Sequence, residues 1–405
     1  MAQKHILDGV TVLDFTQHVA GPSATRLMAE MGAEIIKVEI APNGDQVRNL
    51  GYLKAGRGMY FLQQNRGKQS LCVDVRSDEG RQILLDLLPK VDVLIENFSP
   101  GTIGRMGLDW ETVHAANPKL IMCSISTFGQ TGPLSKLPGY DFIGQAYAGV
   151  TSMIGEADGP PYFPMLAIGD TATGVHALAA INGALFHRAM GGEGQHLDIT
   201  LLDSYFHCHE MNVGIHSASD GEIVPHRSGR HHSAITPAGV FESKDGHMII
   251  IAVLRAWEDL CNAMEMPELL TDPRFEDYAT RVENRFELAD IIEAWLKSQP
   301  NDQVSLAKLE EHRVPVAPVL SIAEAMKHPH LIERGTVRTV SDRGVGEFQM
   351  PGNPIRYSGF PHDMDMKTPF LGEHNLAVLA EKLGMSANDV ERLTAEGVLV
   401  NEDMP

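Results

Sequence analysis

The sequence predicts an α/β protein with a parallel sheet and a second, smaller α+β domain. Three observations lead to this fold class. Short apolar segments alternate with helical segments through the N-terminal half, as in proteins whose helices cover a parallel sheet. Hydrophobic residues make up 43% of the 405 residues, which is enough for a large core. Farther along the chain, two apolar segments flank Lys244-Asp245-Gly246, a pattern typical of a β-hairpin.

Strands and helices are expected in alternation through the N-terminal half. The expected strands are residues 10–15, 33–38, 70–75, 91–96, 120–124 and 196–200. Gly21-Pro22-Ser23 opens a helix that runs to Met31, with Pro22 at its first helical position. Further helices are expected at 77–90 with Ser77 at the start, at 110–116, after Asp170, and around 205–211. Ligands of such a fold bind beyond the carboxyl ends of the strands.

The second half of the chain has a different character. Residues 214–236 are polar and weakly patterned, and we expect a linker there. A hairpin of 239–243 and 247–253 is followed by helices near 256–265, 281–298 and 301–312, which defines a smaller α+β domain at about 225–325. The tail from 330 is expected to hold short strands, a Pro/Gly-rich stretch and a last helical hairpin after 374.

The charge and cysteine content limit the possible partners and the compartment. A formal net charge of −20 argues against nucleic acid or an anionic membrane as the main partner. The four cysteines are scattered and form no CxxC pair, which argues against a disulfide framework or a zinc site. The apolar run 248–254 is too short to span a bilayer. We therefore expect a soluble cytoplasmic protein.

Several familiar catalytic motifs are missing. Gly56-Arg57-Gly58 lacks the third glycine of a dinucleotide loop, Arg66-Gly67-Lys68 is not followed by Ser or Thr as in a P-loop, and there is no GxSxG elbow. His207-Cys208-His209-Glu210 resembles a metal cluster, but residues two apart do not share a helix face. We expect no metal site.

The segment Ile168-Gly169-Asp170-Thr171-Ala172 carries the strongest chemical signal. It places a carboxylate between a glycine and the first residues of an expected helix. There the helix dipole would keep the acid ionised and approachable, so that it could attack an activated acyl group. The same placement suits a plain helix N-cap, and this segment alone leaves both readings open.

Basic residues offer a second candidate feature. Asn97-Phe98 follows an expected strand and Arg105 comes shortly afterwards, which is where an α/β fold places ligand contacts. Arg66, Lys68, Arg76 and Arg105 would form a basic pocket if they converged. Ordinary surface salt bridges explain the same residues.

Taken together, these segments resemble the class III CoA-transferases, the CaiB/BaiF family that includes formyl-CoA transferase. The fragments that carry the resemblance extend over nearly the whole chain and keep the family's order and spacing: 13–16 with 20–22, 36–39, 44–45, 65–68, 97–98, 129 with 132–133, 169–170 and 371–375. The resemblance implies a Rossmann-like large domain built from residues 1–224 and 326–405, a small domain at 225–325, and a homodimer of interlocked, ring-like chains.

The resemblance also implies the residues of the site. Asp170 takes the place of the family's nucleophile, and CoA contacts fall on Val19, Ala20, Val73, Arg76, Asn97, Phe98, Arg105, Tyr140 and Asp141. Two positions depart from formyl-CoA transferase: Val19 stands where that enzyme has a glutamine, and Ile40 stands where it has an arginine.

The implied reaction is the transfer of CoA from an acyl-CoA to a free carboxylic acid through an aspartyl intermediate, with no metal and no permanently bound cofactor. Backbone N–H groups at Gly169 and Thr171 are candidate oxyanion donors. The family's glycine-rich loop corresponds here to 229–233, in which Arg230, His231 and His232 are candidate contacts to a second carboxylate of the acceptor. A small dicarboxylate such as succinate, itaconate, mesaconate or citramalate is the expected acceptor, and oxalate, formate and aromatic acids are the open alternatives.

The alternative activity is that of the α-methylacyl-CoA racemases, which share the fold. Racemases pair the same aspartate with a histidine at the position of Tyr140. Tyrosine is a poor base near neutral pH because its reference pKa is about 10, so the sequence favours the transferase. A CoA-binding protein without activity is disfavoured because Asp170 is present.

Overall fold

The computed structural model describes residues 5–362 and 364–402, so the predicted domain ends at 1 and 405 lie outside the described residues. The described chain divides into two compact units. The first comprises residues up to Val150, Pro164–Glu210 and the residues from His330 onward. The second comprises Thr151–Phe163 and Met211–Pro329.

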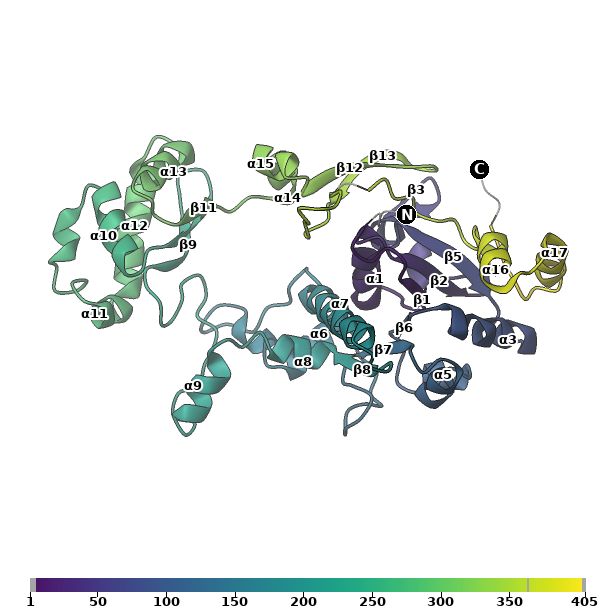
Figure 1. The fold of residues 1–405 in the computed structure, drawn as a ribbon. Coiled ribbons are helices and arrows are strands. Elements are labelled where there is room, and N and C mark those ends of the chain that lie inside the picture. Colours follow the sequence, from purple (N-terminus) through teal and green to yellow (C-terminus); the bar gives the residue numbers. More distant parts are fainter. Residues whose placement is uncertain (1–4, 363, 403–405) are drawn as a thin grey trace. The chain divides into compact units, whose positions relative to one another are not determined.

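The first unit is built on a parallel sheet with the strand order β5-β2-β1-β6-β7-β8 (Figure 1). Its strands are β1 (Thr11–Asp14), β2 (Glu34–Ile40), β5 (Lys68–Val73), β6 (Val93–Glu96), β7 (Ile121–Ser126) and β8 (His196–Thr200). The strands β6 and β7 are buried along their whole length, and β1, β2 and β5 are buried except for one or two residues each, as expected where helices cover both faces of a parallel sheet. The predicted α/β class with a parallel sheet is confirmed.

Two sets of helices cover the two faces of this sheet. Because side chains alternate along a strand, Val12 packs on one face and Leu13 on the other. The helices α1 (Ala20–Glu30) and α7 (Ile168–Ala189) cover the face of Val12 (Figure 1). The face of Leu13 is covered by α3 (Asp78–Leu87), α5 (Trp110–Ala116), α16 (Asn375–Leu383) and α17 (Ala387–Ala395).

The end of the chain is part of the first unit. Val390 and Leu393 of α17 join the same core as Leu13, and Leu399 pairs antiparallel with Val73 at the end of β5. The shorter elements of this unit are β3 (Leu53–Lys54), β4 (Arg57–Gly58), α2 (Met59–Gln64), α4 (Thr102–Arg105), α6 (Asp141–Tyr147), α8 (Leu201–Phe206), α15, whose last residues are His330–Glu333, β12 (Val337–Asp342) and β13 (Gly346–Pro351).

The second unit has its own sheet and core. Its antiparallel strands are β9 (Ala238–Glu242), β10 (His247–Ile251) and β11 (Val316–Pro318), and the predicted hairpin joins β9 to β10. Phe241, Met248 and Trp257 lie in a separate buried cluster. The helices of this unit are α9 (Asn212–Ala218), α10 (Arg255–Ala263), α11 (Tyr278–Glu283), α12 (Arg285–Ser298), α13 (Asp302–Glu311) and α14 (Ile322–Ala325).

Three local predictions differ from the structure. Helix α1 begins at Ala20, so Pro22 is its third residue and not its first. The expected linker 214–236 begins inside α9. The bounds of the second unit also differ from 225–325, because residues 151–163 pack against the segment near 229. There the backbone N–H of Gly229 donates to the carbonyl of Gly155 (3.1 Å), and Arg227 Nε donates to the carbonyl of Gly159 (2.9 Å).

Candidate active site

Asp170 is the third residue of α7 and does not cap it. The helix begins at Ile168, Ala167 occupies the N-cap position, and no side chain makes a capping hydrogen bond there. The capping reading of Asp170 is therefore wrong. A carboxylate in the first turn still faces the positive end of the helix dipole. The N–H of Thr171 donates to the carbonyl of Ala167 (3.3 Å), so this predicted oxyanion donor is already used within the helix.

Asp170 lies close to a second acid, Asp141, at the start of α6. Burial, with the charge of Asp141 added, raises the pKa of Asp170 to about 7. Burial also raises the pKa of Asp141, although the Tyr205 hydroxyl and the N–H groups of Asp170 and Gly169 oppose this shift. The expectation of a fully ionised Asp170 is corrected. With a pKa of about 7, the protonated and ionised forms of its carboxyl are both populated near neutral pH.

Gly169 lets the backbone of α7 approach these groups closely. A Cβ atom on this residue would lie 2.0 Å from Cε2 of Tyr205 and 2.5 Å from Oδ1 of Asp141, distances that no side chain tolerates. The Tyr205 hydroxyl accepts a hydrogen bond from Nε2 of Gln145 (3.1 Å), and both side chains are almost fully buried. Three helices, α6, α7 and α8, therefore meet at one glycine directly before the candidate nucleophile.

A cavity of about 200 Å³ opens at the carboxyl ends of β1, β6 and β7. Its walls include Gln17 and His18 after β1, Asn97 and Phe98 after β6, and Tyr140 directly before Asp141. The rest of the lining is neutral: Ser99, Pro100, Ser126, Thr127, Phe128, Ser135, Leu137, Pro138 and Gly139. The cavity thus occupies the position at which ligands bind in parallel α/β folds.

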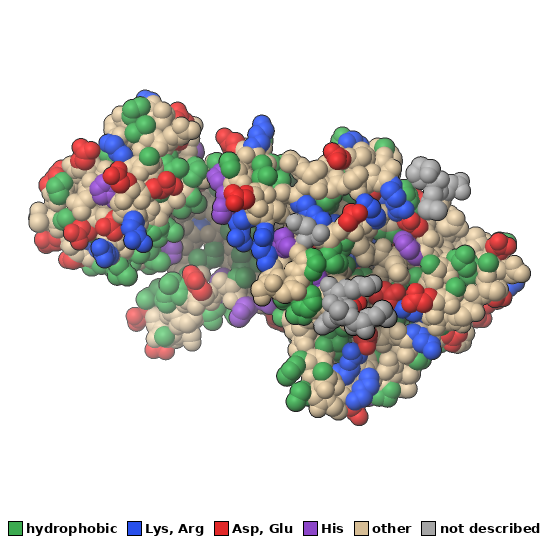
Figure 2. Space-filling view, turned by 45° about the horizontal axis from the view of Figure 1, so that its top comes forward, with side chains coloured by type: hydrophobic (Ala, Val, Ile, Leu, Met, Phe, Trp, Pro, Cys, Tyr) green, Lys and Arg blue, Asp and Glu red, His purple; other side chains and the backbone are tan. Residues whose placement is uncertain are grey.

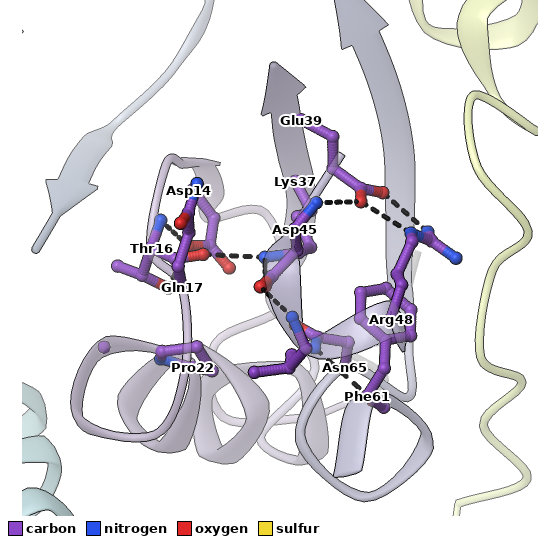
Figure 3. A network of polar contacts seen from close by, with 12 residues as sticks. Asp14, Thr16, Gln17, Pro22, Lys37, Glu39, Asp45, Arg48, Phe61 and Asn65 are labelled. Carbon is purple, nitrogen blue, oxygen red and sulfur yellow. Dashed lines mark hydrogen bonds and ion pairs between the residues drawn. The ribbon is translucent and has the colours of Figure 1, made fainter. Parts of the chain in front are cut away.

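The loop after β1 is held by a buried polar network (Figure 3). Lys37 Nζ donates to the carbonyl of Thr16 (2.7 Å) and pairs with Asp45 (2.8 Å). The carboxylate of Asp14 accepts from the backbone N–H of Thr16 (2.8 Å) and pairs with Lys68 (3.0 Å). Burial lowers the pKa of Lys68 to about 8 in spite of Asp14. Charges this deeply buried fix the backbone of Thr16, the residue before the cavity wall.

The comparisons with known proteins identify the family of this chain. The model of "CoA-transferase family III" matches residues 7–375. The chain belongs to CoA-transferase family III. It is 34% identical to the succinyl-CoA–D-citramalate CoA-transferase of Chloroflexus aurantiacus over 396 residues, which cover 97% of this chain and 98% of that protein.

Other relatives and a solved structure give the same picture. The succinyl-CoA:mesaconate CoA-transferase of Haloarcula hispanica is 38% identical over 95% of this chain and 98% of that protein. The crystal structure of a CaiB/BaiF family protein from Brucella suis matches with a TM-score of 0.82 and 35% identity, covering 94% of this chain and 100% of that one. The resemblance inferred from the sequence is confirmed.

The structure groups some of the CoA contacts predicted for this family III chain. Asn97, Phe98 and Tyr140 line the cavity, and Asp141 lies beside Asp170. Val19 and Ala20 are buried at the start of α1, directly after His18 of the cavity wall.

Other predicted contacts lie away from this cavity. Val73 is the last residue of β5 and is completely buried in the core. Arg76 is exposed and its guanidinium pairs with Asp74 (2.7 Å). Arg105 Nη2 donates to the Thr102 hydroxyl (2.7 Å). These three residues are absent from the cavity lining.

The basic pocket suggested by the sequence does not form. Arg66 is buried against Glu30 (2.5 Å), and Lys68 is buried against Asp14. Their charges are thus balanced inside the protein, while Arg76 stays on the surface. The interpretation was wrong because neighbouring basic residues in the sequence belong to separate ion pairs in the fold.

The residues predicted to contact the acceptor lie in the second unit. Arg230 pairs with Glu293 (3.0 Å), and His231 is buried against the ring of Phe241. Both line a cavity of about 320 Å³ within that unit. His232 Nδ1 accepts from the backbone N–H groups of Ala234 and Ile235, so it shapes its own turn. Their role toward the acceptor stays a prediction.

Among residues 5–362 and 364–402, no group of three or more His, Cys, Asp or Glu side chains is arranged to hold a metal ion. In the motif 207–210, His209 Nε2 instead bonds to the carbonyl of Ala148 (2.8 Å). Across the same described residues, no helix combines the length and apolar character needed to cross a bilayer. On the face drawn in Figure 2, acidic and basic side chains are interspersed.

Sequence reasoning missed four residues of this site. Gln17 and His18 form part of the cavity wall, and Gln145 and Tyr205 lie below Gly169. The signal for the first pair was available, because polar residues between a strand and the next helix lie where ligands bind. Nothing in the sequence indicated the second pair, since a buried tyrosine and glutamine in separate helices carry no local pattern.

Proposed function

We propose that this chain is a class III acyl-CoA:carboxylate CoA-transferase that works through an aspartyl intermediate on Asp170. The reaction is RCO-SCoA + R′COO⁻ → RCOO⁻ + R′CO-SCoA. The observation that carries the proposal is the carboxyl of Asp170 in the first turn of α7, close to Asp141, whose neighbour Tyr140 lines the cavity, in a chain of family III. A titrating acid in that position can act as a nucleophile.

The steps balance without an added reagent. The Asp170 carboxylate attacks the donor thioester, which releases CoA thiolate and leaves a mixed anhydride. The thiolate then attacks the aspartyl carbonyl, which frees the donor acid and forms an aspartyl-CoA thioester. The acceptor carboxylate repeats these steps in reverse and leaves as the new thioester. Every bond that forms replaces one that breaks, so no metal and no permanently bound cofactor is needed.

Small dicarboxylates are the proposed acceptors, with succinyl-CoA as donor. Relatives that align over nearly the whole chain are named for succinyl-CoA with citramalate, mesaconate and glutarate, and each of these acids carries two carboxylates. The formyl-CoA:oxalate CoA-transferase of Streptomyces avermitilis, 33% identical, makes oxalate a further acid to test. All of these reactions share the exchange written above.

Tyr140 supports the transferase over the racemase. A racemase needs a second acid–base group on the substrate face opposite Asp170, and Tyr140 stands where racemases carry a histidine. The Tyr140 ring is 71% exposed and lies edge-on to His18 at 6.2 Å between ring centroids. Exchange of the α-proton of the acyl-CoA in D₂O is expected from a racemase and not from a transferase.

We also propose that two copies of this chain form an interlocked homodimer in the cytoplasm. Apolar residues are exposed along α7 in a single copy, namely Ile168, Val175 and Phe186, and Met190 directly after the helix is exposed as well. An exposed apolar stripe of this kind is typical of an interface. Free cysteines, three of them buried, suit a reducing compartment.

The decisive experiment combines an acid panel with a covalent trap. The protein is incubated with succinyl-CoA and citramalate, mesaconate, glutarate, oxalate or acetate, and new thioesters are detected by mass spectrometry. We expect transfer to the dicarboxylates, a hydroxylamine-dependent mass change at Asp170, and no transfer by Asp170→Ala, which still binds CoA. Turnover by Asp170→Ala close to that of the unmodified protein would rule out the proposed nucleophile.

A further inference from the structure

Tyr205 is a buried tyrosine whose hydroxyl lies between two partners. Only 2% of Tyr205 is exposed, and its hydroxyl accepts a hydrogen bond from Nε2 of Gln145 (3.1 Å). A tyrosine hydroxyl carries a single proton, and the bond from Gln145 leaves that proton for another acceptor. The neighbouring acceptor is the carboxyl of Asp141, whose negative charge the hydroxyl stabilises.

The first turn of α7 also acts on Asp141. A Cβ atom on Gly169 would lie 2.5 Å from Oδ1 of Asp141, so this carboxyl lies against the start of the helix. There the N–H groups of Gly169 and Asp170 stabilise its charge. These contacts are looser than ordinary hydrogen bonds, since both Asp141 oxygens are buried and neither has a partner in ordinary hydrogen-bond geometry. Asp141 is thus the acid whose ionised form the start of α7 favours.

Asp170 lacks such donors in the part of the chain that the structure describes. Burial and the charge of Asp141 raise the pKa of Asp170 to about 7, and no hydrogen bond opposes this shift. Burial raises the pKa of Asp141 as well, but the Tyr205 hydroxyl and the two N–H groups oppose that shift. When the two acids share one negative charge, the charge is therefore more stable on Asp141 and the proton on Asp170.

Two tyrosines are the other ionisable groups that face this pair of acids. Burial, with the charges of Asp170, Asp45 and Asp141 added, raises the pKa of Tyr60 on α2 to about 12. Burial and the contact with Asp141 also raise the pKa of Tyr205, so both hydroxyls keep their protons near neutral pH. Within the described residues, no Lys, Arg or His is among the groups that shift the pKa of either acid. The position of the charge therefore depends on the donors around Asp141.

We propose that Tyr205, held by Gln145, keeps the shared negative charge on Asp141, so that Asp170 carries the proton in the resting protein. This inference rests on the proposed function and deepens it, because Tyr205 and Gln145 become positioning residues that act on the nucleophile through Asp141. Without the hydroxyl, the proton of Asp170 moves to Asp141 and the charge moves to Asp170. No other group gains or loses a proton in this exchange.

Tyr205→Phe is the first test, because it removes only the hydroxyl and keeps the ring that packs against Gly169. Asp170 should then ionise at lower pH, and the acidic limb of kcat/KM for succinyl-CoA should move down by up to about one pH unit. Below this limb the variant should react up to about tenfold faster than the unmodified protein. A variant with a merely disturbed fold would be slower at every pH, and that result would overturn the inference.

Asp141→Asn supplies the matched background. Tyr205 has no charge to hold in that variant, so adding Tyr205→Phe should leave the acidic limb where Asp141→Asn alone places it. An equal shift in both backgrounds would show that Tyr205 does not act through Asp141.

Gln145→Met is a second variant that leaves Tyr205 in place, should Tyr205→Phe fail to fold. It removes the hydrogen bond to the Tyr205 hydroxyl, which makes that hydroxyl a weaker donor to Asp141. The acidic limb should therefore move in the same direction as in Tyr205→Phe, by a smaller amount. A limb that stays in place or moves to higher pH would remove Gln145 from the proposal.

Infrared spectroscopy locates the proton without any turnover. At pH 6, the absorption of protonated carboxyl groups should decrease more in Asp170→Asn than in Asp141→Asn. In the Tyr205→Phe background the order should reverse, with the larger decrease in Asp141→Asn. The same order in both backgrounds would contradict the assignment of the charge.

The inference and the proposed function can fail separately. If the unmodified protein forms no thioester with any acid, the proposed function fails, while the infrared spectra still show which acid holds the proton. If thioesters form and Asp170 is trapped, but Tyr205→Phe leaves the acidic limb in place, only the role of Tyr205 and Gln145 is lost.

Discussion

The side-chain amide of Asn97 makes two hydrogen bonds to the backbone of Gln17. Asn97 Oδ1 accepts from the Gln17 N–H and Asn97 Nδ2 donates to the Gln17 carbonyl, each at 2.7 Å. Gln17 follows β1 and Asn97 follows β6, so this pair joins the loops at the ends of two neighbouring strands. The cavity wall that carries His18 therefore depends on a side chain 80 residues farther along the chain.

Replacing Asn97 is expected to loosen the cavity wall. Asn97→Ala removes both hydrogen bonds and leaves partly buried backbone groups without partners, so we expect a loss of about 1–3 kcal/mol in the free energy of unfolding. The KM for the acyl-CoA should rise more than kcat falls. Urea unfolding and steady-state kinetics measure the two effects. Asn97→Asp keeps the acceptor oxygen and loses the donor, so its loss of stability should be smaller than that of Asn97→Ala. An equal loss of stability in both variants would contradict this account.

The ionised form of Asp170 is expected to destabilise the fold, so the free energy of unfolding should be lower at neutral pH than at pH 4. The folded state raises the pKa of Asp170 from 3.8 to about 7, so it favours the protonated form. The free energy of unfolding then decreases as pH rises from about 4 to about 7 and is constant above that range. Asp170→Asn removes this penalty, with a gain of at most about 4 kcal/mol above pH 7 that shrinks toward pH 4. Thermal unfolding of both proteins from pH 5 to 9 measures the difference, and a gain that is independent of pH would contradict the assignment.

The rate of transfer should follow the ionisation of Asp170. Only the carboxylate attacks the thioester, so kcat/KM is expected to rise with pH up to about 7 and then level off. The charge of Asp141 contributes to the raised pKa of Asp170. Asp141→Asn should therefore move the acidic limb of the profile to lower pH. A limb that stays in place or moves upward in this variant would show that the acids do not interact.

Gly169 should be irreplaceable as long as Tyr205 is present. Gly169→Ala would push a methyl group to 2.0 Å from the Tyr205 ring, and overpacking of this kind costs about 1–3 kcal/mol or more. We expect this variant to lose stability and most of its activity. The double variant Gly169→Ala/Tyr205→Leu provides room and should recover part of the stability, as read by urea unfolding. If the stability losses of the two single substitutions simply added in the double variant, contact with the Tyr205 ring would not be the cause of the loss.

Much of the fold could be predicted from local pattern. The expected strand 196–200 and helix 110–116 match β8 and α5, and Ser77 caps α3 through a bond from the Gly80 N–H (3.0 Å). These features depend on residues close together in the sequence. The prediction of a basic pocket failed because it depended on distant contacts: the partners of Arg66 and Lys68 are Glu30 and Asp14, which lie 36 and 54 residues away.

The sequence by itself determined the α/β class, the family and the identity of the candidate nucleophile. These depend on the spacing of apolar residues and on the order of short motifs, both of which can be read from neighbouring residues. Only the tertiary structure decided how Asp170 is ionised, which side chains surround it, and where His18 lies. The physical reason is that pKa values, close packing and ligand access depend on groups brought together from separate elements. Tyr205 of α8 and the Gly169 N–H of α7 act on the carboxyl of Asp141 in α6, and the charge of Asp141 in turn raises the pKa of Asp170.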